Sequence, residues 1–253
     1  MNIHSSSHVI TRRDYDAVIF DLDGVITQTA TLHKTAWKIL FDDFLKQYAA
    51  RVGEPLQPFD ADWDYRLYID GKARYDGVAS FLASRGITLP YGNSDDGPER
   101  ETVCGLGNKK NALYLELLKS RGVEVYLSTV DLIHELREKQ FATAVVSASR
   151  NCAEVLAAAH LSDLFDTRVD GIDLEQRHLR GKPEPDSFLE AARQIGVDPT
   201  RAVVVEDAIA GVEAGRNGGF GCVIGVDRTG HADALKAAGA DIVVTDLAQL
   251  ETG

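Results

Sequence analysis

The stretch AVIFDLDG, residues 17–24, decides how this chain is interpreted. Its first four residues form a short apolar run typical of a buried strand, and two carboxylates follow at once. One carboxylate of such a pair can attack phosphorus and hold a metal, while the other donates and accepts the proton. Gly24 permits a tight turn after the strand. Taken alone, the pattern fits an acidic turn or a calcium loop equally well.

Beyond Gly122 the sequence alternates between short apolar runs and amphipathic segments. The expected strands cover residues 123–125, 143–146, 202–205, 221–226 and 242–244, and the expected helices cover residues 129–139, 152–159, 186–195 and 208–216. This alternation indicates an α/β fold with a Rossmann-like parallel sheet between two layers of helices. The strand at residues 17–20 has no partner nearby in the sequence, so we expect it to join the later sheet.

The intervening block reads as helical. An apolar face at residues 36–45 ends before Pro55 and Pro58, and residues 73–85 and 109–121 are each followed by a glycine of the C-cap type. We expect an exposed loop at residues 90–98. The predicted domains are a core of residues 12–29 and 121–253, a helical cap of residues 30–120 inserted over the carboxyl edge of the sheet, and a flexible tail of residues 1–11.

The composition is that of a globular protein, with 44% apolar and 26% charged residues in a chain of 253. The formal charge of −12 disfavours binding to nucleic acid or to an anionic membrane. Three distant cysteines indicate reduced thiols, and neither a signal peptide nor a long apolar run is evident. We therefore expect a cytoplasmic protein, and a monomer.

Three more polar clusters stand out in this part of the chain, and two of them directly follow expected strands. Residues 147–151, SASRN, combine hydroxyls with the start of a helix, which is typical of a phosphate site but also of simple helix capping. Lys182 lies in GKPEPD, residues 181–186, where it can neutralise phosphoryl oxygens or stand exposed in a turn. Glu206 and Asp207 suit Mg²⁺, but acidic residues are also common where a helix begins.

Four motifs of this chain resemble, in order and placement, those of the haloacid dehalogenase superfamily, in particular its β-phosphoglucomutase-like branch. They are AVIFDLDGVITQTATLH, SASRN, GKPEPD and VVVEDAIAGVEAG. The resemblance extends from about Tyr15 to Leu250. It implies the fold of that superfamily, an aspartyl-phosphate on Asp21, and Asp23 as general acid and base. It also implies the following further roles: Ser147 and Lys182 bind the transferring phosphoryl group, and Asp21, the Asp23 carbonyl and Asp207 bind Mg²⁺ with support from Glu206.

The same resemblance assigns residues to the substrate. In Gly71-Lys72-Ala73-Arg74 the arginine matches one that grips the distal phosphate of a sugar phosphate, a task that suits a guanidinium. The other matched positions are His33 near the cap entrance, Lys110 and Asn111 facing the sugar, and Ser149, Arg150 and Asn151 on the core side of the phosphate site. Arg74 can also be a surface charge, His33 a helix-start residue, and Lys110 part of a basic helix face.

The implied function is a β-phosphoglucomutase reaction, which interconverts β-glucose 1-phosphate and glucose 6-phosphate through a bisphosphate. A sugar-phosphate phosphatase shares the chemistry up to the phospho-enzyme, and a non-enzymatic interaction protein is a third possibility on this fold. The mutases usually have Asp-Thr-Ala in the linker to the cap, where this chain has Gln28-Thr29-Ala30. The choice between water and a sugar hydroxyl as acceptor therefore stays open.

Overall fold

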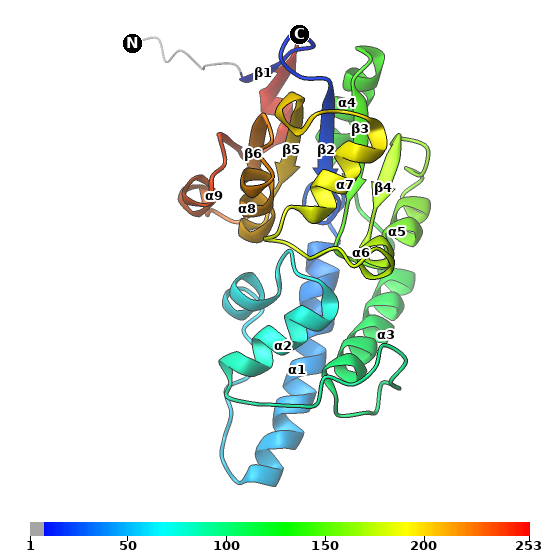
Figure 1. The fold of residues 1–253 in the computed structure, drawn as a ribbon. Helices are drawn as coiled ribbons and strands as arrows, with labels where there is room; N and C mark the ends of the chain where they lie inside the picture. Colours follow the sequence, from blue (N-terminus) through cyan, green and yellow to red (C-terminus); the bar gives the residue numbers. More distant parts are fainter. Residues whose placement is uncertain (1–7) are drawn as a thin grey trace. The chain divides into compact units, whose positions relative to one another are not determined.

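The computed structural model describes residues 8–253 and divides the chain into two compact units. One unit contains the residues up to Gln28 together with Glu124–Gly253, and the other contains Thr29–Val123. Figure 1 shows both units coloured along the sequence. The chain thus leaves the first unit once, forms the second, and returns.

The first unit is built on a six-stranded sheet in the order β4-β3-β2-β5-β6-β7, with every neighbouring pair parallel. Its strands are β2 (Ala17–Asp21), β3 (Ala142–Val146), β4 (Thr167–Val169), β5 (Ala202–Glu206), β6 (Cys222–Val226) and β7 (Ile242–Val244). The strand at residues 17–21 lies in the middle, since Phe20 pairs with both Val145 and Val205. The predicted α/β core with a parallel sheet is therefore confirmed.

Helices bury the four inner strands β3, β2, β5 and β6 almost completely, which explains their continuous apolar sequences, whereas the edge strands β4 and β7 are only partly buried. The helices are α4 (Leu127–Glu138), α5 (Cys152–Ala158), α6 (Gly171–Gln176), α7 (Asp186–Ile195), α8 (Ile209–Asn217) and α9 (Ala232–Ala238). Phe188 of α7 and Val212 of α8 pack in one buried cluster with Ile19 and Val204 of the sheet. None of the helices within residues 8–253 is long and apolar enough to span a membrane.

Two expectations about the edges of this unit were wrong. β1 (His8–Ile10) pairs in parallel with β8 (Leu250–Thr252), so residues 8–10 are not part of a flexible tail. Ile10 is buried there, a contact with the far end of the chain that no local pattern reveals. The rest of the predicted tail, residues 1–7, lies outside the described residues.

Residues 123–125 do not form the expected strand. Only Val125 is bridged, in antiparallel fashion, to Thr27. On either side of this bridge the Gln28 N–H donates to the Glu124 carbonyl (2.8 Å), and the Tyr126 N–H donates to the Ile26 carbonyl (2.9 Å). The outgoing and returning passages of the chain therefore run side by side. β4 and α6 were not predicted, because residues 167–169 hold a single large apolar side chain.

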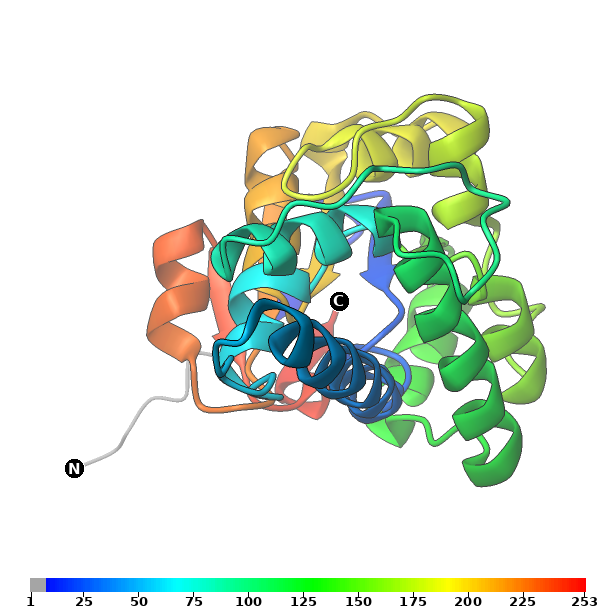
Figure 2. The ribbon, with the colours of Figure 1, turned by 90° about the horizontal axis from the view of Figure 1, so that it is seen from below.

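The second unit is helical and consists of α1 (Ala30–Val52), the π-helix η1 (Tyr65–Ile69), α2 (Arg74–Ser84) and α3 (Val103–Arg121). Figure 2 views this unit along α1. α1 ends at Gly53, which has a positive φ of 76°, just before the first of the two prolines. α3 begins six residues earlier than expected, because the Thr102 side chain caps the Gly105 N–H.

Aromatic side chains form the centre of the helical unit. Phe41 of α1 has its ring centroid 5.2 Å from Trp37, 4.0 Å from Phe81 and 5.3 Å from Phe59. All four side chains are buried. Since α1, α2 and the segment before η1 each contribute a ring, this cluster joins parts of the unit that are distant in sequence.

We expect Phe41→Ala to lower the free energy of unfolding of the helical unit by about 3–5 kcal/mol, because truncation leaves a cavity among the rings. Denaturant titration followed by tryptophan fluorescence measures this loss, since Trp37 lies in the cluster. The control is Ile39→Ala on the same helix, where the side chain is 45% exposed and the change should stay within about 0.5 kcal/mol. Equal losses in the two variants would contradict the packing role of the cluster.

Candidate active site

The strand order brings three polar strand ends together. β3, β2 and β5 are consecutive in the sheet, and they end next to Ser147, at Asp21 and at Glu206 respectively. Because the strands are parallel, these side chains lie at one edge, the carboxyl edge, where open α/β sheets bind ligands. Ser147 and Glu206 are fully buried, and Asp21 is nearly so.

Lys182 connects two of these strands. Its ammonium group donates a hydrogen bond to Asp21 Oδ1 and another to Glu206 Oε1, the latter at 2.6 Å. The lysine side chain is 2% exposed, so the alternative of a lysine exposed in a turn is wrong. The loop is fixed on both sides: the Arg180 guanidinium binds Asp186, and Asn217 Nδ2 donates to the Pro183 carbonyl at 3.2 Å.

The buried cluster around Lys182 contains more carboxylates than ammonium groups. Burial favours the neutral form of Lys182, but the carboxylates of Asp21 and Glu206 outweigh this effect and raise its pKa, so it stays an ammonium. Burial also raises the pKa of Asp21; Lys182 opposes this rise, whereas the charges of Glu206 and Asp23 add to it. One cation therefore serves more carboxylates than it can neutralise.

The turn after β2 places Asp23 beside this cluster, and Asp207, which follows β5, lies against the same turn. The Ser147 hydroxyl donates to Asp23 Oδ2 at 3.2 Å. Gly24 has φ of 91°, and a Cβ atom there would lie 1.9 Å from Asp207 Oδ2. Only glycine therefore allows the Asp207 carboxylate to approach the turn this closely.

Sequence reasoning missed Arg228, which lies just after β6. Its Nε donates to the Gly24 carbonyl at 3.0 Å, and its guanidinium carbon lies 3.6 Å from the centre of the Tyr126 ring. The side chain is 13% exposed. Arg228 thus holds the turn that carries Asp23, and its position after a strand end was the only sequence signal available.

The loop of residues 147–151 is shaped by its own hydroxyls. Ser147 Oγ accepts from the Ser149 N–H at 3.1 Å, and Ser149 Oγ accepts from the Asn151 N–H at 3.2 Å. Asn151 is buried and precedes α5, but its side chain makes no capping hydrogen bond to that helix. Arg150 forms an ion pair with Glu175 of α6 rather than with the carboxylates of the cluster.

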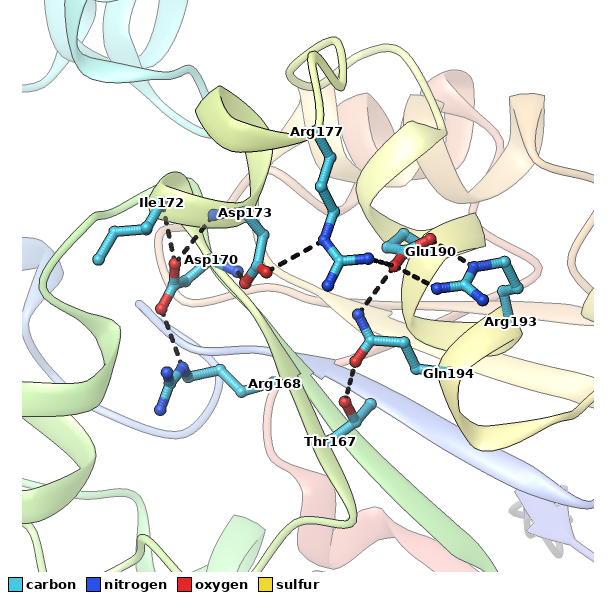
Figure 3. A network of polar contacts seen from close by, with 9 residues as sticks. All are labelled: Thr167, Arg168, Asp170, Ile172, Asp173, Arg177, Glu190, Arg193 and Gln194. Carbon is cyan, nitrogen blue, oxygen red and sulfur yellow. Dashed lines mark hydrogen bonds and ion pairs between the residues drawn. The ribbon is translucent and has the colours of Figure 1, made fainter.

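Helix α6 supports this loop from behind. The Gly171 N–H donates to the Ser149 carbonyl at 3.1 Å, and a Cβ on Gly171 would meet the Ala148 carbonyl oxygen at 2.7 Å. Asp170, which is buried, begins α6 with a reciprocal capping box that includes Asp173 (Figure 3). The start of α6 thus sets the backbone position of residues 148–150.

A polar network extends from α6 to α7 (Figure 3). Arg177 contacts Asp173 at 3.4 Å and Glu190 at 2.6 Å. Glu190 also accepts from Arg193 (2.7 and 2.8 Å) and from Gln194 (2.9 Å). These bonds, led by those from Arg193, lower the pKa of Glu190 to about 2. Lys182 belongs to the loop that connects α6 to α7, so the network fixes the two helices from which this loop begins and in which it ends.

The predicted substrate residues of the helical unit form pairs within that unit. Arg74 Nη2 donates to Asn111 Oδ1 at 2.9 Å, and Lys110 Nζ lies 2.6 Å from His33 Nδ1. Lys110 is buried, so it does not belong to an exposed basic face. Lys72 donates instead to Ser80 Oγ at 2.9 Å, and the neighbouring Gly71 has a positive φ of 72°.

The carboxylates at the sheet edge fit a magnesium ion. Within residues 8–253, no three His, Cys, Asp or Glu side chains converge into a ready-made cage. Asp21 and Asp207, with the Asp23 carbonyl, nevertheless offer the few hard oxygen ligands that Mg²⁺ takes from a protein when water and phosphate supply the rest. The excess of carboxylates over Lys182 favours a divalent cation here.

A model of the haloacid dehalogenase-like hydrolase family matches residues 15–219. The chain belongs to this family, whose members share the α/β core described above. The predicted resemblance to that superfamily is thereby confirmed, and the chain is an enzyme of this class.

Several of its relatives are named beta-phosphoglucomutase. The chain is 49% identical over 237 residues to a protein of Mycobacterium tuberculosis (strain CDC 1551 / Oshkosh) named beta-phosphoglucomutase, with 92% of this chain and 90% of the relative covered. It is 33% identical to the beta-phosphoglucomutase of Bacillus subtilis (strain 168), with 92% and 91% covered. The crystal structure of beta-phosphoglucomutase from Clostridium difficile superposes with a TM-score of 0.71 at 27% identity, with 94% and 93% covered.

Gly171→Ala tests the support of the loop by α6. A methyl group there collides with the backbone of residues 148–150, so the loop must shift, and a shift of about 1 Å can reduce turnover by about 100-fold. We expect kcat to fall by at least about tenfold without loss of the fold by circular dichroism. The control is Ile172→Ala on the same helix, whose side chain is 37% exposed. Unchanged kcat in Gly171→Ala would refute the role.

Glu190→Gln tests the polar network. The carboxylate has a lower pKa in the folded chain than in the unfolded chain, so its stabilising effect is complete above the usual value of 4.5 and is lost as the pH falls toward about 2. We expect the variant to lose about 1–3 kcal/mol of unfolding free energy at pH 7. Its stability should also vary less between pH 4.5 and pH 2 than that of the parent. Urea titrations across this range measure both effects, and parallel pH profiles would contradict the assignment.

Proposed function

We propose that this enzyme is a β-phosphoglucomutase that transfers a phosphoryl group through an aspartyl-phosphate on Asp21. The observation that carries this proposal is the ammonium of Lys182, which binds Asp21 directly beside the Asp23–Ser147 hydrogen bond. A nucleophile, a proton donor and a cation for phosphoryl oxygens thus meet at one sheet edge. The names of the relatives support the choice of substrate.

In the first half of the proposed reaction, an Asp21 oxygen attacks phosphorus and the bond from phosphorus to the sugar oxygen breaks. Asp23 protonates that departing oxygen, and Ser147 and Lys182 hold the phosphoryl oxygens. In the second half, Asp23 removes the proton from the accepting sugar hydroxyl, whose oxygen takes the phosphoryl group back from Asp21. The first half converts glucose 1,6-bisphosphate to glucose 6-phosphate and leaves the phosphoryl group on Asp21. The second half transfers this group to the C6 hydroxyl of β-glucose 1-phosphate, which regenerates the bisphosphate.

Magnesium would be held by Asp21, the Asp23 carbonyl and Asp207, with Glu206 nearby, and it would shield the negative charges of the phosphoryl group from the attacking carboxylate. Glu206 has a second task, since its Oε1 accepts from Lys182 and its Oε2 accepts from the Ala208 N–H at 2.7 Å. It thereby keeps the ammonium in place when Asp21 is phosphorylated.

The helical unit is proposed as a cap that selects the substrate. Arg74 suits the phosphate that is not being transferred, because a guanidinium can bind it through two hydrogen bonds. Asn111 already orients that guanidinium. His33, Lys110, Gly71 and Lys72 are proposed to surround the sugar from this unit, and Ser149, Arg150 and Asn151 from the core. For Arg150 this requires release from Glu175.

A phosphatase is the second candidate function. The observation that favours it is Gln28, an exposed residue whose Nε2 lies 3.5 Å from the Val125 carbonyl, at the place where the mutases usually have aspartate. A neutral side chain changes the charge at the entry to the helical unit. Water instead of a sugar hydroxyl would then accept the phosphoryl group. Under either function we propose a cytoplasmic monomer that acts on a small sugar phosphate, without nucleic-acid or membrane partners.

Phosphorus NMR of the purified protein with β-glucose 1-phosphate, Mg²⁺ and a trace of glucose 1,6-bisphosphate separates the two functions. We expect growth of a glucose 6-phosphate signal. Asp21→Ala should abolish it, and Arg74→Ala should reduce kcat/KM by at least about 100-fold, since a partly buried, charged hydrogen-bond donor to the phosphate is lost. Arg121→Ala, at the exposed end of α3, is the control. Release of inorganic phosphate alone would establish the phosphatase. Equal rates in Arg74→Ala and the parent would contradict the assignment of Arg74 to the phosphate that is not transferred.

A further inference from the structure

A pocket of about 560 Å³ lies wholly within the helical unit, between the segment after α1 and the end of α2. Its volume falls in the range of small-molecule sites. The lining residues that matter to its chemistry are Gln57, Asp60, Trp63, Asp64, Tyr68 and Arg85. None of them belongs to the proposed reaction site.

One residue of the π-helix η1, Tyr68, lines this pocket. The Asp70 N–H donates to the Tyr65 carbonyl at 2.9 Å, a bond that spans five residues instead of four. Such helices are rare and are frequently found at functional sites. Asp64 immediately precedes η1 and Tyr68 lies within it, so the π-helix sets how these two side chains are spaced along the wall.

An ion pair lines the same pocket. Arg85 Nη2 binds Asp64 Oδ2, and the two side chains are 18% and 4% exposed. Arg85 Nε is buried and has no hydrogen-bond partner. Burying a charged pair costs free energy, and leaving one of its donors unmatched adds to that cost. This arrangement is poor as a device for stability alone.

Trp63 provides an aromatic surface. Its side chain is 58% exposed, the largest exposed fraction among the aromatic side chains of the pocket wall, and the Arg66 guanidinium lies 5.1 Å from its ring. The neighbouring Asp60 carboxylate is fixed, because its Oδ1 accepts from the Asp62 N–H at 2.9 Å and from the Trp63 N–H at 2.7 Å. A rigid carboxylate and an exposed indole thus stand side by side at the pocket.

We propose that this pocket binds a neutral sugar, a mono- or disaccharide without phosphate. Asp60, Asp64 and Arg85 together carry a net charge of −1, and Asp64 already neutralises the guanidinium, so the pocket disfavours a phosphate group. Sugar hydroxyls match the amide of Gln57 and the carboxylate of Asp60, while the C–H faces of a sugar ring suit the indole and the Tyr68 ring. The site is separate from that of the proposed reaction and does not depend on it.

Intrinsic fluorescence tests the proposal directly. The chain has only two tryptophans, and Trp37 is 3% exposed, so a ligand in the pocket alters chiefly the emission of Trp63. We expect saturable changes on titration of the full chain with glucose, maltose or sucrose. Calorimetry with the best of these sugars should show binding at least about tenfold weaker in Trp63→Ala, a difference of about 1.4 kcal/mol.

The control is Tyr91→Ala, which removes another exposed aromatic side chain of the same unit from outside the pocket and should bind as the parent does. Turnover of β-glucose 1-phosphate should be unchanged in Trp63→Ala, which separates this site from the reaction site. The proposal is overturned if the emission shows no saturable change with any sugar up to the solubility limit. It is equally overturned if inorganic phosphate or glucose 6-phosphate produces the change and the neutral sugars do not, or if Trp63→Ala binds sugar like the parent.

Discussion

The hydrogen bonds from the Lys182 ammonium to Asp21 and Glu206 are the interaction on which the rest of the core depends. Three buried charges are tolerable only when they meet at short range, because each pays a desolvation cost of several kcal/mol on its own. The three side chains can meet only if β2 and β5 are neighbours, if these strands end at the same level, and if the loop before α7 reaches across them. The sheet order, the fixed loop and the network around Glu190 can all be understood as conditions for this contact.

Much of this arrangement was predictable, because a parallel sheet converts sequence into position in a simple way. Polar clusters that follow apolar strands must gather at one edge, so the sequence alone predicts that Asp21, Ser147 and Glu206 lie together. The strand at residues 17–20 could be assigned to the later sheet, because no other strand is expected near it in the sequence. Apolar periodicity also predicted which segments are helical. It did not predict where α3 begins, because that start depends on the Thr102 cap, which lies outside the periodic stretch.

The features that escaped prediction depend on contacts between distant residues. Arg228 and the Gly24 carbonyl are 204 positions apart, and no local pattern relates them. Gly171 matters because of the backbone that it approaches, which the sequence does not show. The strand at His8–Ile10 exists only through its pairing with β8. Arg150 was expected among the phosphate ligands, but its pairing with Glu175 requires knowledge of where α6 lies.

The adjacent passages at Ile26–Gln28 and Glu124–Tyr126 have a consequence for how this chain can diversify. They are hydrogen-bonded to each other, so the two ends of the inserted segment are a few ångströms apart at its root. A turn of a few residues could join them without disturbing any strand of the sheet. The insert is thus topologically equivalent to a long hairpin loop, and its length and content can change by insertion, deletion or recombination while the residues of the core are inherited intact.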